Sequence, residues 1–314
     1  MTLKNGVVLG LALVVAITGG CAKKAELAMK FEPSQTATYK VATESIKDYN
    51  FEQPSINQSK KQQTINGSEV VFDQTVQSVD AQGVATILVT IKGASYTAKN
   101  PTGEGMQYDS SKADSGMAKL IGQSYTLKIA PDGNVAAIEN TQAAKAAVAG
   151  DNQEAKVAQS LLTDEAIKAR HSVPLPKNKA ELKKGKSWSV LKGSPAGMLV
   201  PKSYEKVYTL EEVKKDDGKE VAIVKMEARP SSAKAADVQG ESAKGMGFFE
   251  KMFDAKESYK GELVMDGANG SVINYHETLK SEWVATEPSE EVKSDKGPDI
   301  LTMGFTYKYS IEKI

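Results

Sequence analysis

The sequence is poor in the residues on which most recognisable active sites depend. Its 314 residues include one cysteine, Cys21, and two histidines, His171 and His276. A Cys/His metal site needs several such ligands close together, and these histidines lie far apart in the chain. H-E-x-x-H, G-x-S-x-G, Walker-type and dinucleotide-binding patterns are missing as well. We therefore predict a protein that is not an enzyme and holds no metal or cofactor, with a hydrolase as the weaker alternative.

The sequence also lacks an excess of charge of either sign. Lysine and arginine total 40, aspartate and glutamate total 40, and aromatic residues make up only 6% of the chain. Nucleic-acid binding requires a basic face, and a polybasic membrane patch requires clustered lysine and arginine. We expect neither, and so no nucleic-acid partner.

No apolar run is long enough for a membrane-spanning helix. The longest, residues 6–17, falls short of the roughly 20 residues that a bilayer requires. It follows Lys4 and precedes the small residues Thr18-Gly19-Gly20, which is the layout of a secretory signal. We predict that residues 1–20 are a signal peptide.

Small residues followed by Cys21 resemble the lipobox of bacterial lipoproteins, although that family usually has leucine where this chain has Thr18. The resemblance implies that Cys21 becomes the mature N-terminus and carries acyl chains, which anchor a protein stably when two or more are present. Ala22 then favours the outer membrane, facing the periplasm. The alternative is an ordinary signal peptide that is cut elsewhere and leaves a free thiol.

Strand-like segments follow a short tether at residues 21–35. They alternate apolar and polar residues or are rich in β-branched residues, and Asp/Gly/Asn turns separate several of them. They are residues 36–46, 69–79, 84–96, 124–129, 135–138, 186–191, 204–213, 220–228, 258–265, 271–279 and 301–311. Residues 99–118 and 287–299 have the composition of loops. Successive hairpins of this kind indicate an antiparallel sheet.

An alanine-rich segment, residues 141–169, has helical spacing of its apolar residues and ends before the proline-containing sequence at 171–176. It divides the chain into a first β-rich half at 36–141, a helical connector at 142–180 and a second β-rich half at 181–314. Tyr125 and Tyr259 open hairpins 134 residues apart, and the turn glycines Gly83 and Gly218 are 135 apart. This indicates an internal duplication; coincidence is the alternative, since such turns are common.

These features together predict a mainly β protein with a few covering helices. We expect the two halves to share one large curved antiparallel sheet or partly closed barrel, because a sheet of this many strands curls.

Three short motifs invite a functional interpretation. Ser203-x-x-Lys206 and Ser231-x-x-Lys234 match the S-x-x-K of serine acyl-enzymes, but the partner motifs are missing. Asp266, Asn269 and Ser271 cluster around glycines without the spacing of a calcium loop, so we interpret them as a turn.

Residues 245–253 concentrate apolar side chains, and on a helix four of them form one stripe: Met246, Phe249, Met252 and Phe253. Methionine and phenylalanine adapt to varied apolar ligands. One interpretation is a hydrophobic lid over an apolar groove; the other is a short helix packed permanently on the sheet.

Cys21, the chain length and the tyrosine-led hairpins around Asp-Gly turns resemble a family of uncharacterised bacterial lipoproteins of unknown function. The resemblance supplies no catalytic residues. We therefore expect a membrane-anchored binding protein for a lipid or other hydrophobic small molecule, or alternatively a structural or interaction module that binds another envelope protein.

Overall fold

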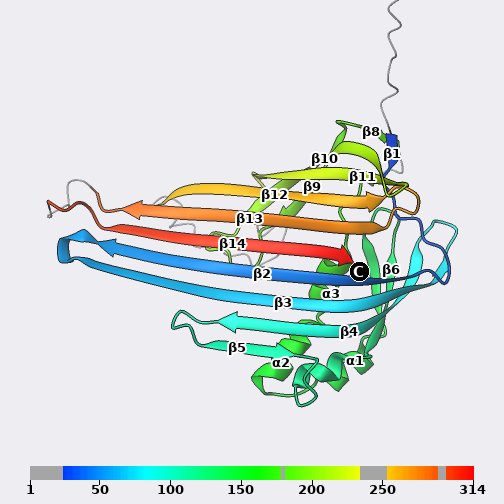
Figure 1. Cartoon of the computed structure of the whole chain (residues 1–314), viewed down its shortest axis with the longest axis horizontal. Helices are drawn as coiled ribbons and strands as arrows, with labels where there is room; N and C mark the ends of the chain where they lie inside the picture. Colours follow the sequence, from blue (N-terminus) through cyan, green and yellow to red (C-terminus); the bar gives the residue numbers. More distant parts are fainter. Residues whose placement is uncertain (1–23, 178–180, 234–252, 289–294) are drawn as a thin grey trace, which may run out of the picture.

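One antiparallel sheet dominates the computed structural model of the chain, which describes residues 24–177, 181–233, 253–288 and 295–314 (Figure 1). Its twelve strands follow the order β7-β6-β4-β3-β2-β14-β13-β12-β11-β10-β9, with β5 paired to β4. The sheet curves without closing, which confirms the predicted fold class. A second, two-stranded sheet pairs β1 with β8.

The first-half strands are β1 (Lys24–Glu26), β2 (Thr36–Gln53), β3 (Gln58–Val79), β4 (Ala85–Lys99), β5 (Gly105–Asp109), β6 (Ser124–Ile129) and β7 (Val135–Glu139). The second-half strands are β8 (Glu181–Lys183), β9 (Ser187–Gly193), β10 (Ser203–Asp216), β11 (Lys219–Pro230), β12 (Asp254–Asp266), β13 (Val272–Thr286) and β14 (Ile300–Lys313). The helices are α1 (Gln142–Ala147), α2 (Gln153–Ser160) and α3 (Asp164–His171), with 3-10 turns at η1 (Pro54–Ile56) and η2 (Gly116–Leu120).

Helices α1–α3 lie behind the sheet, toward the end that holds the C-terminus, whereas β2, β3, β13 and β14 run well beyond them (Figure 1). We call the face that carries the helices the inner face and the opposite one the outer face. Strand side chains alternate between the two, so β10 directs Tyr204, Lys206, Tyr208 and Leu210 inward, and all four are buried. The core therefore lies between the inner face and the helices.

The helical connector is three helices rather than the single one expected. Asn152 and Thr163 each interrupt the run, because their side chains cap new helices by accepting hydrogen bonds from the backbone of Ala155 and Ala166. Residues 99–118, expected as a loop, contain β5 and the start of η2. Strand β5 forms because its Tyr108 pairs with Tyr96 of β4 and the two rings stack.

The segment expected as a tether is packed from Lys24 onward. Leu27 and Ala28 are buried, Met29 N–H donates to Pro131 O at 2.8 Å, and Lys30 N–H donates to Asn269 O at 3.0 Å. Pro131 lies in the β6–β7 turn and Asn269 in the β12–β13 turn. The N-terminal segment thus joins one hairpin turn of each half.

The two series of strands progress in the same direction along the sheet and meet where β2 pairs with β14. Gly83 and Gly218 both have positive φ and occupy the β3–β4 and β10–β11 turns. Tyr125 of β6 and Tyr259 of β12 are both buried. The landmarks that suggested a duplication therefore hold corresponding places in the two series.

Candidate functional site

A carboxylate on the inner face, Glu277 of β13, lies at the centre of a buried polar cluster. Lys206 Nζ donates to its Oε2 at 2.7 Å, Tyr275 donates to the same oxygen at 2.7 Å, and Tyr259 donates to Oε1 at 2.7 Å. Lys206 also lies over the Tyr259 ring, 4.4 Å from its centroid. A buried carboxylate is tolerated when it is paired and hydrogen-bonded in this way.

Aromatic side chains extend the cluster toward the sheet edge. The Tyr208 and Tyr275 hydroxyls lie 3.1 Å apart, and Tyr208 stacks on Trp188 of β9 with ring centroids separated by 5.5 Å. Trp188 Nε1 donates to Pro174 O at 3.0 Å. The segment after α3 therefore contacts the Trp188 side chain on the inner face of β9.

Burial fixes the protonation of the surrounding phenols. It is the main cause of the raised pKa of Tyr259, Tyr275 and Tyr307, and the charge of Glu277 raises each of them further. These tyrosines stay protonated at neutral pH, and Tyr259 and Tyr275 act as hydrogen-bond donors to the carboxylate. Since Glu277 already accepts from three donors, the cluster has the character of a structural and electrostatic centre.

A second carboxylate, Glu257 of β12, lies further along the inner face. It accepts from Lys202 Nζ at 2.7 Å and from the Tyr204 hydroxyl at 3.2 Å. The Tyr204 ring meets the Tyr259 ring edge-on, with centroids 5.4 Å apart. The two carboxylates are thus linked through neighbouring tyrosines.

Helix α3 packs on the inner face beside the Glu277 cluster. The Tyr309 hydroxyl of β14 donates to Ala169 O at 3.2 Å. His171 is buried and hydrogen-bonds through both ring nitrogens, to Gln74 of β3 at 2.8 Å and to Tyr125 of β6 at 2.7 Å. Burial, followed by the charge of Arg170, holds the pKa of His171 well below its usual range. This histidine is a neutral packing residue.

Beyond the helices, the inner face becomes apolar. Register places Trp283 opposite Met303, Met303 opposite Tyr49, and Leu301 opposite Phe51. Trp283 is buried, whereas Met303, Leu301, Tyr49 and Phe51 are each half-buried. We call these five residues the apolar row.

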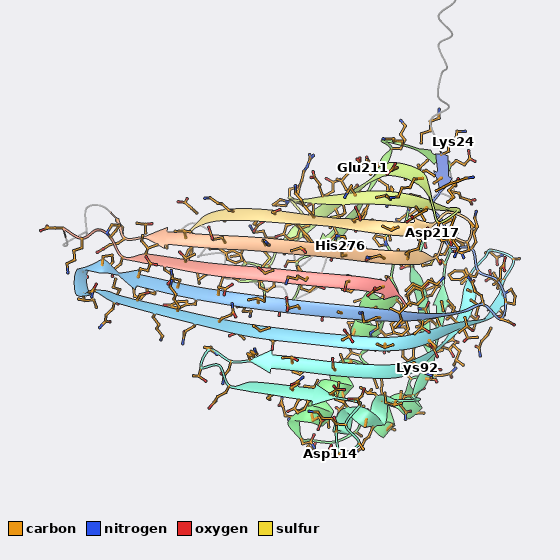
Figure 2. All side chains as sticks on the ribbon, viewed as in Figure 1. Lys24, Lys92, Asp114, Glu211, Asp217 and His276 are labelled. Carbon is orange, nitrogen blue, oxygen red and sulfur yellow. The ribbon has the colours of Figure 1, made fainter. Side chains whose placement is uncertain are left out.

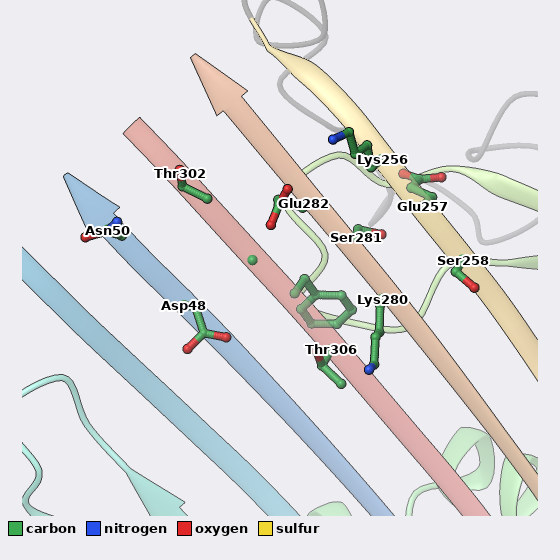
Figure 3. Close-up of a pocket in the computed structure, with 12 residues that line it drawn as sticks. Asp48, Asn50, Lys256, Glu257, Ser258, Lys280, Ser281, Glu282, Thr302 and Thr306 are labelled. Atoms are coloured by element: carbon green, nitrogen blue, oxygen red, sulfur yellow. The ribbon is translucent and has the colours of Figure 1, made fainter. Parts of the chain in front are cut away.

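The outer face carries two polar hollows. One, of about 450 Å³, surrounds Gly304, whose missing side chain leaves a gap beside Asp48, Lys280 and Glu282 (Figure 3). The other, of about 800 Å³, crosses β10–β13 and includes His276, which lies on the outer face (Figure 2). Within the described part of the chain, no cluster of three or more His, Cys, Asp or Glu side chains could hold a metal ion.

The structure places the residues singled out in the sequence in different surroundings, and some of them lie outside the described part of the chain. Cys21, Met246, Phe249, Met252 and Lys234 lie outside the described residues. Phe253 is half-buried and packs against the core. Lys206 belongs to the Glu277 cluster, while Ser203 lies on the other side of β10 as its alternation requires.

The group at Asp266, Asn269 and Ser271 is a turn, as predicted. Asp266 Oδ1 accepts from Ala268 N–H at 2.8 Å, and Asp266 N–H donates to Ser271 O at 2.9 Å. Glu277 and its tyrosines were not anticipated. One signal could have found them: Lys206 and Glu277 are charged residues on the apolar sides of alternating strands.

Comparison with protein families gives one match, to a family of unknown function, DUF6263, over residues 82–272. The match covers more than half of the chain. The chain belongs to the DUF6263 family. The region shared with other DUF6263 members runs from the β3–β4 turn to the start of β13, so it includes Lys206 and Tyr259 and ends before Glu277. This agrees with the expected resemblance to a family of unknown function.

No curated protein matches the chain. Solved structures that align with it include one on lipid–protein interactions in lipovitellin, with a TM-score of 0.45, 9% identity, 91% of this chain and 25% of that chain covered. The chain thus spans a quarter of the lipovitellin chain. OccK5 (OpdH) of Pseudomonas aeruginosa gives a TM-score of 0.21 and 7% identity, with 89% of this chain and 98% of that chain covered. A DUF1329 family protein from Desulfovibrio piger gives a TM-score of 0.12 and 9% identity, with 87% of this chain and 85% of that chain covered. All three TM-scores are below 0.5.

Proposed function

We propose that this chain is an exported, lipid-anchored and non-catalytic binding protein that holds a hydrophobic small molecule on the inner face of its sheet. The observation that carries the proposal is the apolar row: Trp283, Met303, Leu301, Tyr49 and Phe51 line the inner face where the long strands run past the helices. When a ligand covers half-buried apolar side chains, their removal from water stabilises the complex by about 25 cal/mol per Å² of apolar surface buried.

The anchoring part of the proposal rests on the sequence around Cys21. None of the described helices is both long and apolar enough to span a bilayer. Only Ala22 and Lys23 separate Cys21 from β1, and a few residues reach about 10 Å at most. Acyl chains on Cys21 would therefore hold the β6–β7 and β12–β13 turns close to the membrane, which we propose is the outer membrane on its periplasmic side.

The non-catalytic part rests on the saturation of Glu277. Its carboxylate accepts from Lys206, Tyr259 and Tyr275, which leaves it poorly placed to take a proton from a substrate. Effective general bases need an accessible lone pair directed at the reacting group.

Ligand binding is tested with two substitutions at neighbouring positions of β14. Met303 lies on the inner face and Thr302 on the outer one, where it lines the Gly304 hollow. Native mass spectrometry of the chain purified from its envelope should detect a bound hydrophobic compound, and titration with dodecanol should compete with it. Met303→Glu should abolish both signals, and Thr302→Glu should retain them. Absence of bound compound together with absence of dodecanol binding would overturn the proposal.

Anchoring is tested by Cys21→Ser. The variant should move from the envelope lipid fraction to the soluble periplasmic fraction. If it fractionates with envelope lipid like the unchanged chain, anchoring through this cysteine is wrong.

An interaction module is the second candidate function, because β9 is an edge strand that pairs with no described strand other than β10. It is the last strand in the order and exposes 44% of Leu191. Exposed edges can pair with a strand of another chain. Cross-linking from position 191 in intact cells should then trap one defined envelope protein; a diffuse set of products would reject this function.

A further inference from the structure

The inner face near Glu277 carries more positive than negative charge. Lys192 of β9 lies in electrostatic range of Lys206 of β10 and of Lys168 of α3, and Glu277, the partner of Lys206, acts on it as well. The chain as a whole has equal numbers of acidic and basic residues. The excess is therefore a local arrangement and does not follow from composition.

Register brings these lysines to the same face. Lys192 pairs with Tyr204, and Lys206 pairs with Val190, so Lys192 and Lys206 are diagonal neighbours on the inner face. Lys168 approaches from the helix that Tyr309 fixes to the sheet through Ala169 O. The strand register therefore makes Lys192 and Lys206 neighbours, and the charge of Lys168 on the helix acts on Lys192.

Only one of the three lysines has a carboxylate partner. Lys206 is paired with Glu277 at 2.7 Å, whereas no described carboxylate lies within 4.0 Å of Lys192 or Lys168. Desolvation lowers the pKa of Lys192, Lys206 and Lys168 lower it further, and Glu277 acts in the opposite direction. Like charges held together in this way are relieved when an anion binds between them.

We infer that the ligand of the inner face is an anionic amphiphile whose carboxylate or phosphate head group binds Lys192 and Lys168. This rests on the proposed hydrophobic-ligand function and adds the chemistry of the head group. The apolar tail of the ligand would lie along the apolar row. The Tyr204 hydroxyl donates to Glu257, which lies opposite Ser281 in the β12–β13 register. Ser281 in turn lies opposite Phe305 of β14, two residues from Met303 of the apolar row.

The test compares three probes on the full-length chain: dodecanoate, dodecanol and inorganic phosphate. Trp188, which lies on the same strand as Lys192, should report binding through its fluorescence. Lys192→Gln and Lys168→Gln should each weaken dodecanoate binding about ten- to hundredfold, the loss expected for a charge-assisted contact. Neither should change dodecanol binding. Lys308→Gln is the control, because Lys308 pairs with Glu44 on the outer face.

Each outcome separates the two proposals. If dodecanoate and dodecanol bind equally and the lysine variants change neither, the anionic head group is rejected while the hydrophobic ligand stands. If neither amphiphile binds, the proposed function fails as well. If phosphate alone binds as tightly as dodecanoate with the same lysine dependence, the site takes a free anion and the amphiphile is rejected. Lys192→Gln removes a repulsive charge, so its unfolding temperature should not fall, which keeps the test independent of misfolding.

Discussion

Gly261 lies directly opposite Glu277 across the β12–β13 pair, and its missing side chain leaves room for the Glu277 Cβ and the Met226 side chain. A Cβ at Gly261 would lie 2.5 Å from His276 O, 3.1 Å from Glu277 Cβ and 3.1 Å from Met226 Cε. The first distance is to backbone, which moves only with the strand. The cluster therefore depends on a glycine in the neighbouring strand as well as on its own polar groups.

The first prediction follows from this contact. Gly261→Ala should lower the free energy of unfolding by about 1–3 kcal/mol, the usual cost of overpacking. Gly67→Ala is the matched control in β3, since its Cβ would meet only Thr43 O at 3.5 Å. The control should be neutral or slightly stabilising, because alanine reduces the entropy of the unfolded chain. Equal urea midpoints for the two variants would contradict the role given to Gly261.

The second prediction concerns the Lys206–Glu277 ion pair. Glu277→Leu leaves a buried ammonium without its carboxylate and should cost about 3–5 kcal/mol. Lys206→Met alone should also destabilise, but the double variant should be more stable than the sum of the two losses predicts. A double-mutant cycle from urea unfolding measures this coupling.

Lys260 and Glu227 provide the comparison for that cycle. They pair on the outer face at 3.4 Å, with side chains 70% and 67% exposed. Lys260→Met should change stability by no more than about 1 kcal/mol. A coupling energy near zero for Lys206 and Glu277 would show that the buried pair is energetically no different from this exposed one.

Alternation along the strands was enough to predict most of the sheet. The β10 and β11 segments, with a glycine turn between them, appear within a few residues of their predicted bounds. Residues 47–68 were not assigned, because most of them are polar and their few apolar residues do not alternate along the whole segment. They form the ends of β2 and β3 through cross-strand polar contacts, such as the bond from Gln63 to Asp48 at 2.8 Å.

The site was less predictable than the sheet, because it joins residues that are distant in the chain. Alternation places Lys206 between Tyr204 and Tyr208, and it places Glu277 on the same side of β13 as Tyr275. It does not pair the two, since that requires the strand order from β10 to β13 and the curvature of the sheet. Most of the predicted lid, Met246, Phe249 and Met252, lies outside the described residues, and the lid stays a prediction.

The third prediction concerns stability at acidic pH. The folded-state pKa of His171 is well below that of the unfolded chain, about 6.5. Below pH 6.5 the unfolded state binds a proton that the folded state does not, so stability falls as pH decreases, by up to about 1.4 kcal/mol per pH unit from this group. Above that pH the effect is absent.

Denaturation between pH 7 and pH 5 measures the slope. His171→Gln should flatten it, and His276→Gln should leave it unchanged, because His276 is exposed on the outer face. If both variants keep the slope of the unchanged chain, burial of His171 is not its cause.

The fourth prediction concerns the N-terminal segment that follows the proposed anchor. Gly270 has φ +66°, and a Cβ there would lie 1.9 Å from Ala28 O. Gly270→Ala should therefore displace residues 24–30 from the β12–β13 turn, in addition to the cost of about 1–2 kcal/mol for a left-handed alanine. Gly218→Ala carries only that second cost, since φ is +78° and no atom lies within 4 Å of its Cβ position. Trypsin should cleave at Lys24 and Lys30 faster in Gly270→Ala than in Gly218→Ala. Equal cleavage rates would mean that the contact between Gly270 and Ala28 does not hold the segment in place, and that the anchored end of the protein is a free tether.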